Sequence, residues 1–356
     1  MFDSMLIKSD KGTYGVEFDE AGFKKIKRFL NDDSHFIMDS KLVDLYPEIL
    51  KDFVSHPNTI LVEAKESNKA ILQVLPVIEN LLGNGVRRGH TLVAIGGGVI
   101  QDITCFISSV LFRGLDWNFI PTTLLAQADS CIGSKSSINL GESKNILGTF
   151  KPPKNILICP MFLETLSRRE ILSGIGEIIK VHTIDGVESF DRLSDNYDCL
   201  LTDPLILLEF TERALSIKKK YIEIDEYDQG IRNIFNYGHS FGHAIESATN
   251  FAIPHGISVT IGMDMANRIA AWKGIIAEHH YERMHGLLRN NYKDFLGTKI
   301  PVDLLIKGLK KDKKNTSENL VLILPTGEKA TVEKIEIKAD EDFSSLCKKY
   351  FDEIFV

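Results

Sequence analysis

The stretch TLVAIGGGVIQDITCFISSVLF, from Thr91 to Phe112, decides the fold class of this chain. An apolar run of strand length leads into three glycines, and apolar residues at helical spacing follow them. Two similar runs, HFIMDS and NTILVEA, precede this stretch with helical patterns around them, and the strand-like WNFIPTTLLAQADS follows it. This alternation predicts an α/β domain in which helices cover a parallel sheet.

The sequence pattern changes near Ser167. Long helical patterns dominate from there on, in SRREILSGIGEIIKVHTI, LILLEFTERALSIKKKYIEIDEY, IRNIFNYGHSFGHAIESAT and ISVTIGMDMANRIAAWKGI. We therefore predict two domains. They are an α/β domain over residues 1–166 and a mostly helical domain over residues 167–356.

The composition is that of a globular protein with a normal core, because 44% of the 356 residues are hydrophobic and 26% are charged. The formal charge of -7 argues against nucleic acid or a membrane surface as a partner. No apolar run approaches the roughly 20 residues of a membrane span, and the N-terminus lacks the pattern of a signal peptide. The five scattered cysteines form no CxxC pair, which favours reduced thiols and a cytoplasmic protein.

The three glycines predict a nucleotide site. Without a Cβ at Gly97 and Gly98, the backbone can approach a pyrophosphate, and the N-terminus of the following helix favours its negative charge. A glycine-rich turn of this kind can also be purely structural. Asp102 lies one turn into the predicted helix, where it either contacts the nicotinamide end of a dinucleotide or is simply solvated.

Several cations lie in glycine-rich or apolar surroundings. The stretch DSCIGSKSSINLGESKN, between segments that look buried, is either a solvated loop or part of a site. An acidic protein that places cations in such segments is typical of one that binds a small polyanion. The cations concerned are Arg113, Lys135, Lys144, Lys180, Lys218 and Arg232.

The stretch NYGHSFGHAIESA places His239 and His243 four residues apart, on one face of a helix. This spacing suits a metal site, and it equally suits a pair of core histidines. His255 follows a proline at a predicted helix start, and Glu177 lies in the apolar helix GIGEIIK, where an unpartnered glutamate is costly. One glutamate and two histidines from separate segments form a ligand set for Zn²⁺ with an open position.

Seven motifs in order resemble the sugar-phosphate cyclase family, whose best-known member is 3-dehydroquinate synthase. They are GGGVIQD, FRG, PTTLLAQADSCIGSKSSIN, KNILGTF, GIGEIIK, GIRNIFNYGHSFGHAIE and PHGISVTIGM, and the resemblance extends from about Asp39 to Asp312. It implies a homodimeric, NAD- and metal-dependent lyase of the shikimate pathway. The Rossmann-like domain over residues 1–166 would bind NAD, and the helical domain over residues 167–356 would bind the metal ion and the substrate. Such an enzyme cyclises a small sugar phosphate, 3-deoxy-arabino-heptulosonate 7-phosphate, to 3-dehydroquinate with elimination of phosphate.

Carried over residue by residue, the resemblance implies a metal ion, Zn²⁺ or Co²⁺, held by Glu177, His239 and His255, with His243 as an acid/base. It implies that NAD is held by Asp39, Glu66, Lys69, Gly97, Gly98, Asp102, Thr122, Thr123 and Lys144. The other catalytic residues would be Lys135, Lys180, Asp228, Arg232 and Asn236. The substrate would further contact Arg113, Asp129, Asn145, Lys218 and Lys313.

The chain departs from the family's pattern at several positions. Family glycines are replaced by Gln101, Cys105, Ser134 and Ser137, a threonine by Ser136, a glutamate by Ile257, and the proton-accepting glutamate by Asp228. The glutamine and serine changes border the expected nicotinamide and substrate region. They leave open a cyclase of another sugar phosphate, such as sedoheptulose 7-phosphate or glucose 6-phosphate. A metal-dependent polyol dehydrogenase, which would release NADH, is an alternative from another reaction class.

Overall fold

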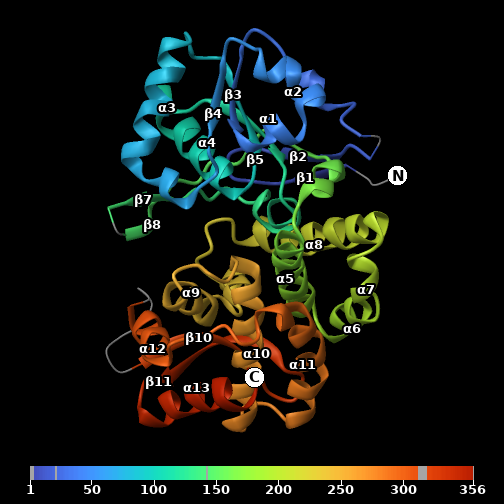
Figure 1. Cartoon of the computed structure of the whole chain (residues 1–356), viewed down its shortest axis with the longest axis vertical. Helices are drawn as coiled ribbons and strands as arrows, with labels where there is room; N and C mark the ends of the chain where they lie inside the picture. The colour runs from blue at the N-terminus through green and yellow to red at the C-terminus, as the bar shows by residue number, and fades with distance from the viewer. Residues whose placement is uncertain (1–3, 21, 142, 312–318, 356) are drawn as a thin grey trace. The chain divides into compact units, whose positions relative to one another are not determined.

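The computed structural model describes residues 4–20, 22–141, 143–311 and 319–355 of the chain. By its internal contacts the chain divides into two compact units (Figure 1). The first comprises Met1–Ser167 and Thr211–Gln229, and the second comprises Arg168–Phe210 and Gly230–Val356. The first break falls one residue beyond the boundary expected from the sequence, whereas the grouping of Thr211–Gln229 with the first unit was not expected. The roles assigned to the two domains stay predictions.

A seven-stranded sheet forms the centre of the first unit, in the order β1-β2-β9-β6-β5-β3-β4. Strands β1 and β2 pair antiparallel and all other neighbours pair parallel, so the predicted parallel sheet is confirmed. The strands are β1 (Met5–Ile7), β2 (Tyr14–Phe18), β3 (Ser34–Asp39), β4 (Thr59–Val62), β5 (Thr91–Gly96), β6 (Asp116–Pro121) and β9 (Asn155–Ile158).

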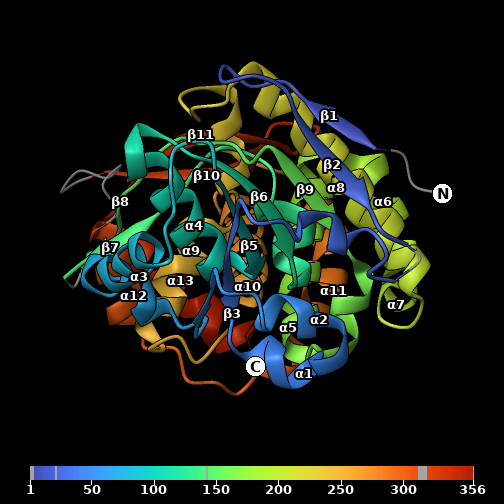
Figure 2. The same cartoon turned by 90° about the horizontal axis from the view of Figure 1, so that it is seen from above.

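Helices cover both faces of this sheet (Figures 1 and 2). Phe36 and Met38 of β3 pack in one core cluster with Leu50 and Phe53 of the neighbouring helix, while Ile37 between them points to the other face. Both faces are therefore buried, which explains why the strands read as continuous apolar runs. One face carries α1 (Lys41–Leu45) and α2 (Pro47–Val54), and the other carries α3 (Ile71–Gly83) and α4 (Gly98–Val110).

Shorter elements connect the strands and helices of this unit. The stretch read as either a solvated loop or a site folds in part into a small hairpin of β7 (Ile138–Leu140) and β8 (Ser143–Leu147). A π-helical turn, η4 (Ala126–Ser130), precedes it, and the 3-10 turns η2 (Glu66–Lys69) and η3 (Leu111–Arg113) follow β4 and α4.

The second unit is mostly helical, as predicted, and it also contains an unpredicted hairpin of β10 (Asn319–Thr326) and β11 (Thr331–Lys338). Its helices are α5 (Arg168–Asp185), α6 (Val187–Asp195), α7 (Tyr197–Leu200), the start of α8 (Pro204–Ile224), α9 (His239–Ala248), α10 (His255–Trp272), α11 (Glu278–Tyr292), α12 (Val302–Lys311) and α13 (Glu341–Glu353).

The prediction of one continuous helical stretch from Ile231 to Thr249 was wrong. A 3-10 turn, η6 (Ile231–Asn236), ends before α9 begins, and Gly238 between them has a φ of 75°. Glycine adopts this left-handed conformation without steric cost. The break makes His239 the first residue of α9, so its side chain lies at a helix end.

Close backbone contacts join α5 to α10. A Cβ added at Gly256 of α10 would lie 1.8 Å from the carbonyl oxygen of Ser173, and a Cβ at Gly176 of α5 would lie 2.2 Å from the carbonyl oxygen of Gly256. Only glycine fits at such a contact. Because Glu177 and His255 directly adjoin these glycines, the contact brings their two side chains together.

Replacing Gly256 by alanine is expected to lower the free energy of unfolding by at least about 1–3 kcal/mol, since the added methyl group forces the two helices apart. The matched control is Gly286→Ala on α11, where an added Cβ meets nothing within 4 Å. That change is expected to be neutral or to stabilise by up to about 1 kcal/mol through helix propensity. Urea unfolding of both variants measures the difference, and equal effects would contradict the role of this contact.

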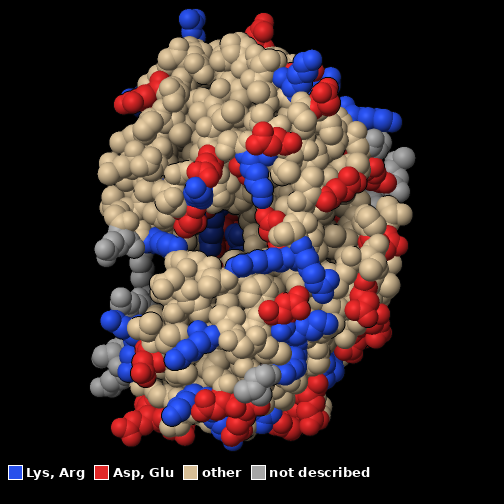
Figure 3. Space-filling view, viewed as in Figure 1, with Lys and Arg blue, Asp and Glu red and all other residues tan. Residues whose placement is uncertain are grey.

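Within the described ranges, no helix combines the length and the apolar character that a membrane crossing needs. Acidic and basic side chains are interspersed on the face drawn in Figure 3. All five cysteines are free thiols, and all but the half-buried Cys199 are buried, as expected. Burial raises the pKa of the Cys105 and Cys131 thiols to about 12, so neither is a reactive thiolate near neutral pH.

Candidate active site

The second unit brings three predicted metal ligands to one point. Glu177 projects from the middle of α5, and His239 and His255 are the first residues of α9 and α10. The Oε1 atom of Glu177 lies 3.4 Å from Nε2 of His255 and 3.8 Å from Nε2 of His239. The three side chains therefore converge although the sequence separates them widely.

Glu177 is almost fully buried, with 1% of its side chain exposed. Its Oε2 accepts a hydrogen bond from Lys180 at 2.5 Å, whereas its Oε1 has no hydrogen-bond partner among the residues that the structure describes. Burial alone would raise the pKa of Glu177, but the adjacent Lys180 ammonium outweighs it and holds the pKa well below its usual range. Glu177 is thus a carboxylate with one oxygen still to be satisfied.

The geometry around this oxygen fits a metal ion. Two ligands on a tetrahedral ion with bonds of about 2.0–2.2 Å are separated by about 3.3–3.6 Å, close to the distances found here. A buried oxygen without a hydrogen-bond partner is costly, and a cation removes that cost. Ring nitrogens of His239, His243 and His255 also lie within 4.8 Å of one another. We favour the set with Glu177 because only that set satisfies the buried oxygen.

The ring orientations of the two histidines suit this role. Nδ1 of His239 lies 3.2 Å from the carbonyl oxygen of Tyr237, and Nδ1 of His255 lies 3.2 Å from Oε2 of Glu246. Each contact requires a proton on Nδ1, because the facing oxygen is an acceptor. The other ring nitrogen, Nε2, is directed at Glu177. Without a metal ion, burial would lower the pKa of His255, but the two carboxylates raise it to about 10. Burial and then Lys180 hold the pKa of His239 well below its usual range.

Sequence reasoning did not assign a role to Glu246, although α9 places it on the face that carries His239 and His243. A glutamate seven residues after the first histidine and three after the second was the available signal. His243 itself is exposed, and its ring centroid lies 5.3 Å from that of His239. The predicted common face of His239 and His243 is therefore confirmed, and the reading of the pair as buried core histidines is wrong.

The remaining predicted residues of this unit flank the cluster. Arg232 is buried in η6, and the side-chain amide of Asn236 donates to the carbonyl oxygen of Asn233. The ammonium of Lys180 lies 5.8 Å from the centre of the Phe235 ring. Lys313, predicted to contact substrate, lies outside the described residues.

In the first unit, the glycine turn lies at the carboxyl edge of the sheet. Gly97 caps α4, and a Cβ added at Gly98 would meet only open space. Asp39 ends β3, while Thr122 and Thr123 follow β6, and both strands are direct neighbours of β5. Burial raises the pKa of Asp39. A crevice at this edge is where open α/β sheets bind nucleotides, so these residues fit a dinucleotide.

A buried ionic network lies beside that turn. Lys69, 5% exposed, donates to Asp102 at 2.8 Å and to the side chain of Asn145 at 2.9 Å. Ser137 donates to Asp102 from both its backbone N–H and its hydroxyl group. Burial raises the pKa of Asp102, against the opposing effect of Lys69. Of the two readings, the solvated one is therefore wrong, whereas the contact to a dinucleotide stays a prediction. Glu66 joins the network through the amide of Asn139.

Two further ion pairs of the first unit join predicted site residues. Lys135 pairs with Asp228, and Lys218 pairs with Asp129 at 2.8 Å while donating to its carbonyl oxygen at 2.6 Å. The two pairs thus connect the stretch from η4 to Lys135 with the segment Thr211–Gln229. Two further cations of this unit, Arg113 and Lys144, are exposed, and their predicted contacts to substrate and NAD stay predictions.

Several of the residues that stand in place of the family's residues have partners or are buried within the fold. The side-chain amide of Gln101 donates to the carbonyl oxygen of Ser130 at 2.6 Å, and its Oε1 accepts from the Ser130 hydroxyl at 2.7 Å. Gln101 is buried, and these two hydrogen bonds attach it to the turn η4, which also contains Asp129. Ser136 shares a hydrogen bond of 2.8 Å with Thr149, and Ile257 is fully buried.

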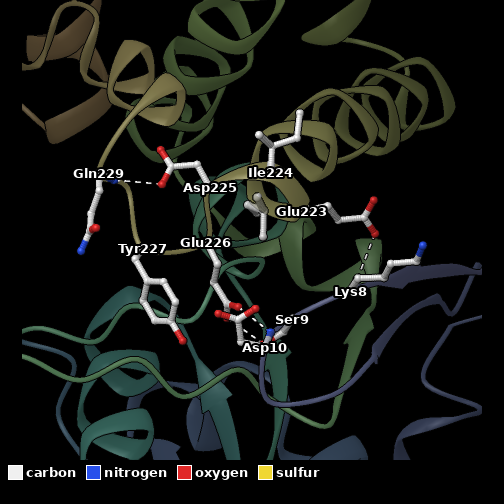
Figure 4. A pocket seen from close by; sticks show the side chains of 10 residues that line it. Lys8, Ser9, Asp10, Glu223, Ile224, Asp225, Glu226, Tyr227 and Gln229 are labelled. Atoms are coloured by element: carbon white, nitrogen blue, oxygen red, sulfur yellow. Dashed lines mark hydrogen bonds between the residues drawn. The ribbon is translucent and has the colours of Figure 1, made fainter.

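A separate cavity of about 240 Å³ lies between the N-terminal segment and the end of α8 (Figure 4). Here Glu226 accepts from the Ser9 hydroxyl and from the backbone of Asp10, each at 2.8 Å. Glu223 accepts from the backbone of Lys8 at 2.9 Å. None of the predicted site residues that the structure describes lines this cavity. Its carboxylates Glu223 and Glu226 hydrogen-bond to the segment Lys8–Asp10.

Together these features define a class of two-unit proteins. One unit is an α/β unit with a glycine turn at the carboxyl edge of its sheet, and the other is a helical unit with a cluster of one buried carboxylate and histidines. Residues 59–173 match the family described as 3-dehydroquinate synthase N-terminal, and residues 174–315 match 3-dehydroquinate synthase C-terminal. The chain belongs to the 3-dehydroquinate synthase family.

Individual relatives agree with this assignment. The chain is 33% identical over 357 residues to a 3-dehydroquinate synthase of a Thermoanaerobacter species, covering 95% of this chain and 98% of the relative. A 2-epi-5-epi-valiolone synthase from Streptomyces hygroscopicus, solved with NAD⁺ and Zn²⁺, is 25% identical with a TM-score of 0.81, covering 96% and 99% of the two chains. A 2-deoxy-scyllo-inosose synthase, solved with carbaglucose-6-phosphate, NAD⁺ and Co²⁺, is 23% identical with a TM-score of 0.82, covering 99% and 100%; it shares the fold.

Removing one ligand from the centre should abolish tight metal binding. We expect Glu177→Gln and His255→Ala to weaken Zn²⁺ binding by more than the roughly 10- to 100-fold typical of outer partners, because each deletes a direct ligand. The control is Glu209→Gln, which breaks only a surface ion pair with Arg192. Metal content after dialysis measures the effect, and NAD binding should persist. Wild-type metal content in either variant would refute the ligand assignment.

Proposed function

We propose that this chain is an NAD- and metal-dependent lyase that converts 3-deoxy-arabino-heptulosonate 7-phosphate to 3-dehydroquinate with elimination of phosphate. The observation that carries the proposal is the buried Glu177 oxygen facing Nε2 of His239 and His255. The relatives named 3-dehydroquinate synthase supply the reaction.

Glu177, His239 and His255 would hold the metal ion, Zn²⁺ or Co²⁺. The glycine turn would hold NAD together with the residues around it, namely Asp39, Glu66, Lys69, Gly97, Gly98, Asp102, Thr122, Thr123 and Lys144. When bound, the metal ion supplies Lewis acidity toward a substrate hydroxyl group, and NAD⁺ supplies a hydride acceptor that later returns the hydride.

The chain's own residues bind the anionic substrate and move protons. Lys180 and Arg232 are buried cations of the second unit, and they would contribute to binding a phosphate or carboxylate group of the substrate. Asn236 would orient a substrate hydroxyl group, and the exposed ring of His243 would exchange a proton with the substrate. Further contacts would come from Arg113, Asp129, Lys135, Asn145, Lys218 and Lys313.

Asp228 would accept a proton in the place of the family's glutamate. Its contact with Lys135, another predicted catalytic residue, supports a place for Asp228 in the same site. The identity of 33% over almost the whole chain to a 3-dehydroquinate synthase supports the heptulosonate as substrate over other sugar phosphates.

We also infer a cytoplasmic homodimer. The exposed Arg113, whose φ is 68°, would lie near the subunit boundary. Sedimentation velocity at working concentration should therefore give a dimer, and a monomer would contradict the inference.

Purified protein should release phosphate from 3-deoxy-arabino-heptulosonate 7-phosphate with Zn²⁺ and only catalytic amounts of NAD⁺. Absorbance at 340 nm should not accumulate, because the hydride returns in each cycle. Phosphate release and absorbance are followed in the same reaction, with Glu177→Gln protein as the inactive control.

Other outcomes separate the alternatives. Phosphate release from sedoheptulose 7-phosphate or glucose 6-phosphate, with none from the heptulosonate, would replace the proposed substrate by another sugar phosphate. Stoichiometric NADH from a polyol would establish a dehydrogenase instead of a lyase.

A further inference from the structure

We propose that Glu246 is a positioning residue, which fixes the tautomer and the ring orientation of His255 so that Nε2 of His255 is available to the metal ion. The inference rests on the proposed metal centre, and it adds a residue outside the predicted site. Its basis is the contact of 3.2 Å between Oε2 of Glu246 and Nδ1 of His255.

The contact links two helices at the centre itself. Glu246 lies in the last turn of α9, and His255 is the first residue of α10. The Glu246 side chain is 13% exposed, so water competes weakly for its carboxylate. A carboxylate beside a helix N-terminus is also favoured by the helix dipole. Partial burial and the helix dipole thus both favour a carboxylate at this position.

The chemistry of the imidazole ring explains the function of this contact. A neutral histidine has one N–H donor and one nitrogen with a free lone pair. A carboxylate only accepts hydrogen bonds, so Glu246 requires the proton to be on Nδ1 of His255. The lone pair then lies on Nε2, the nitrogen that faces Glu177 at 3.4 Å. The negative charge also makes that nitrogen a stronger electron donor to a cation.

His255 depends on this support more than His239 does. The side chain of His255 is 34% exposed, compared with 15% for His239. His239 receives its corresponding contact from a backbone carbonyl oxygen, that of Tyr237, which no substitution removes. For His255 the acceptor is a side chain, and its removal leaves a partly exposed ring free to rotate.

The test measures Zn²⁺ affinity of the full chain by competition with a chromogenic chelator. Glu246→Ala should weaken Zn²⁺ binding by about 10- to 100-fold, the range found for outer partners of metal-bound histidines. Glu246→Gln keeps an acceptor oxygen, and its loss should be smaller, less than about 10-fold. The visible absorption of the Co²⁺-loaded protein should shift in the alanine variant and stay close to wild type in the glutamine variant.

The matched control is Glu278→Ala. Glu278 also connects a neighbouring helix to α10, through Arg268, but it lies away from the metal centre. It should change urea unfolding of the metal-free protein without changing Zn²⁺ affinity. This control separates a positioning role from a general loss of helix packing.

Zn²⁺ affinity of the alanine and glutamine variants within about twofold of wild type would overturn the proposal, since an outer partner should cost at least about 10-fold. Equal losses in the alanine and glutamine variants would likewise contradict a role through the acceptor oxygen. If the wild-type protein binds no Zn²⁺, the proposed metal centre fails and this inference fails with it, which is a distinguishable result.

Discussion

A buried carboxylate that must remain charged is the constraint on which the second unit depends. An unpaired charge at the depth of Glu177 costs about several kcal/mol, and Lys180 compensates only one of its two oxygens. The other oxygen faces two imidazole rings, where a protonated ring nitrogen or a metal ion can become its partner. Metal ligands must be deprotonated, so the two compete, and metal binding displaces the proton. The glycine contacts between α5 and α10 are what allow these groups to meet.

The two units contribute different groups to the proposed reaction. In the first, the carboxyl edge of a parallel sheet presents a helix N-terminus without side chains, bordered by Asp39 and by the threonines after β6. Its buried pairs, Lys69 with Asp102 and Lys218 with Asp129, fix charged side chains in defined positions before any ligand binds. Such preorganisation reduces the reorganisation that accompanies reaction. In the second unit, oriented imidazole rings achieve the same for the metal centre.

Much of the fold and of the candidate site could be predicted from the sequence, and the features that were not predicted have physical reasons. The strand–turn–helix at Thr91–Phe112 is encoded locally, by apolar spacing and by glycines. The strand β2 depends on pairing with the distant β9, and β11 is mostly exposed. Neither segment therefore shows the apolar run of a buried strand in its sequence. The break at Gly238 was missed because a helical period continues across it. The proposed metal ligands came from a family resemblance, whereas the contact of Glu246 with His255 required the packing of α9 on α10.

X-ray diffraction measured at the zinc absorption edge, from crystals of Zn²⁺-loaded protein, tests the ligand set most directly. We expect one ion bonded to Oε1 of Glu177 and to Nε2 of His239 and His255 at about 2.0–2.2 Å, with His243 not bonded to it. An ion held instead by His239, His243 and His255, with Glu177 still paired only to Lys180, would contradict this structure of the centre.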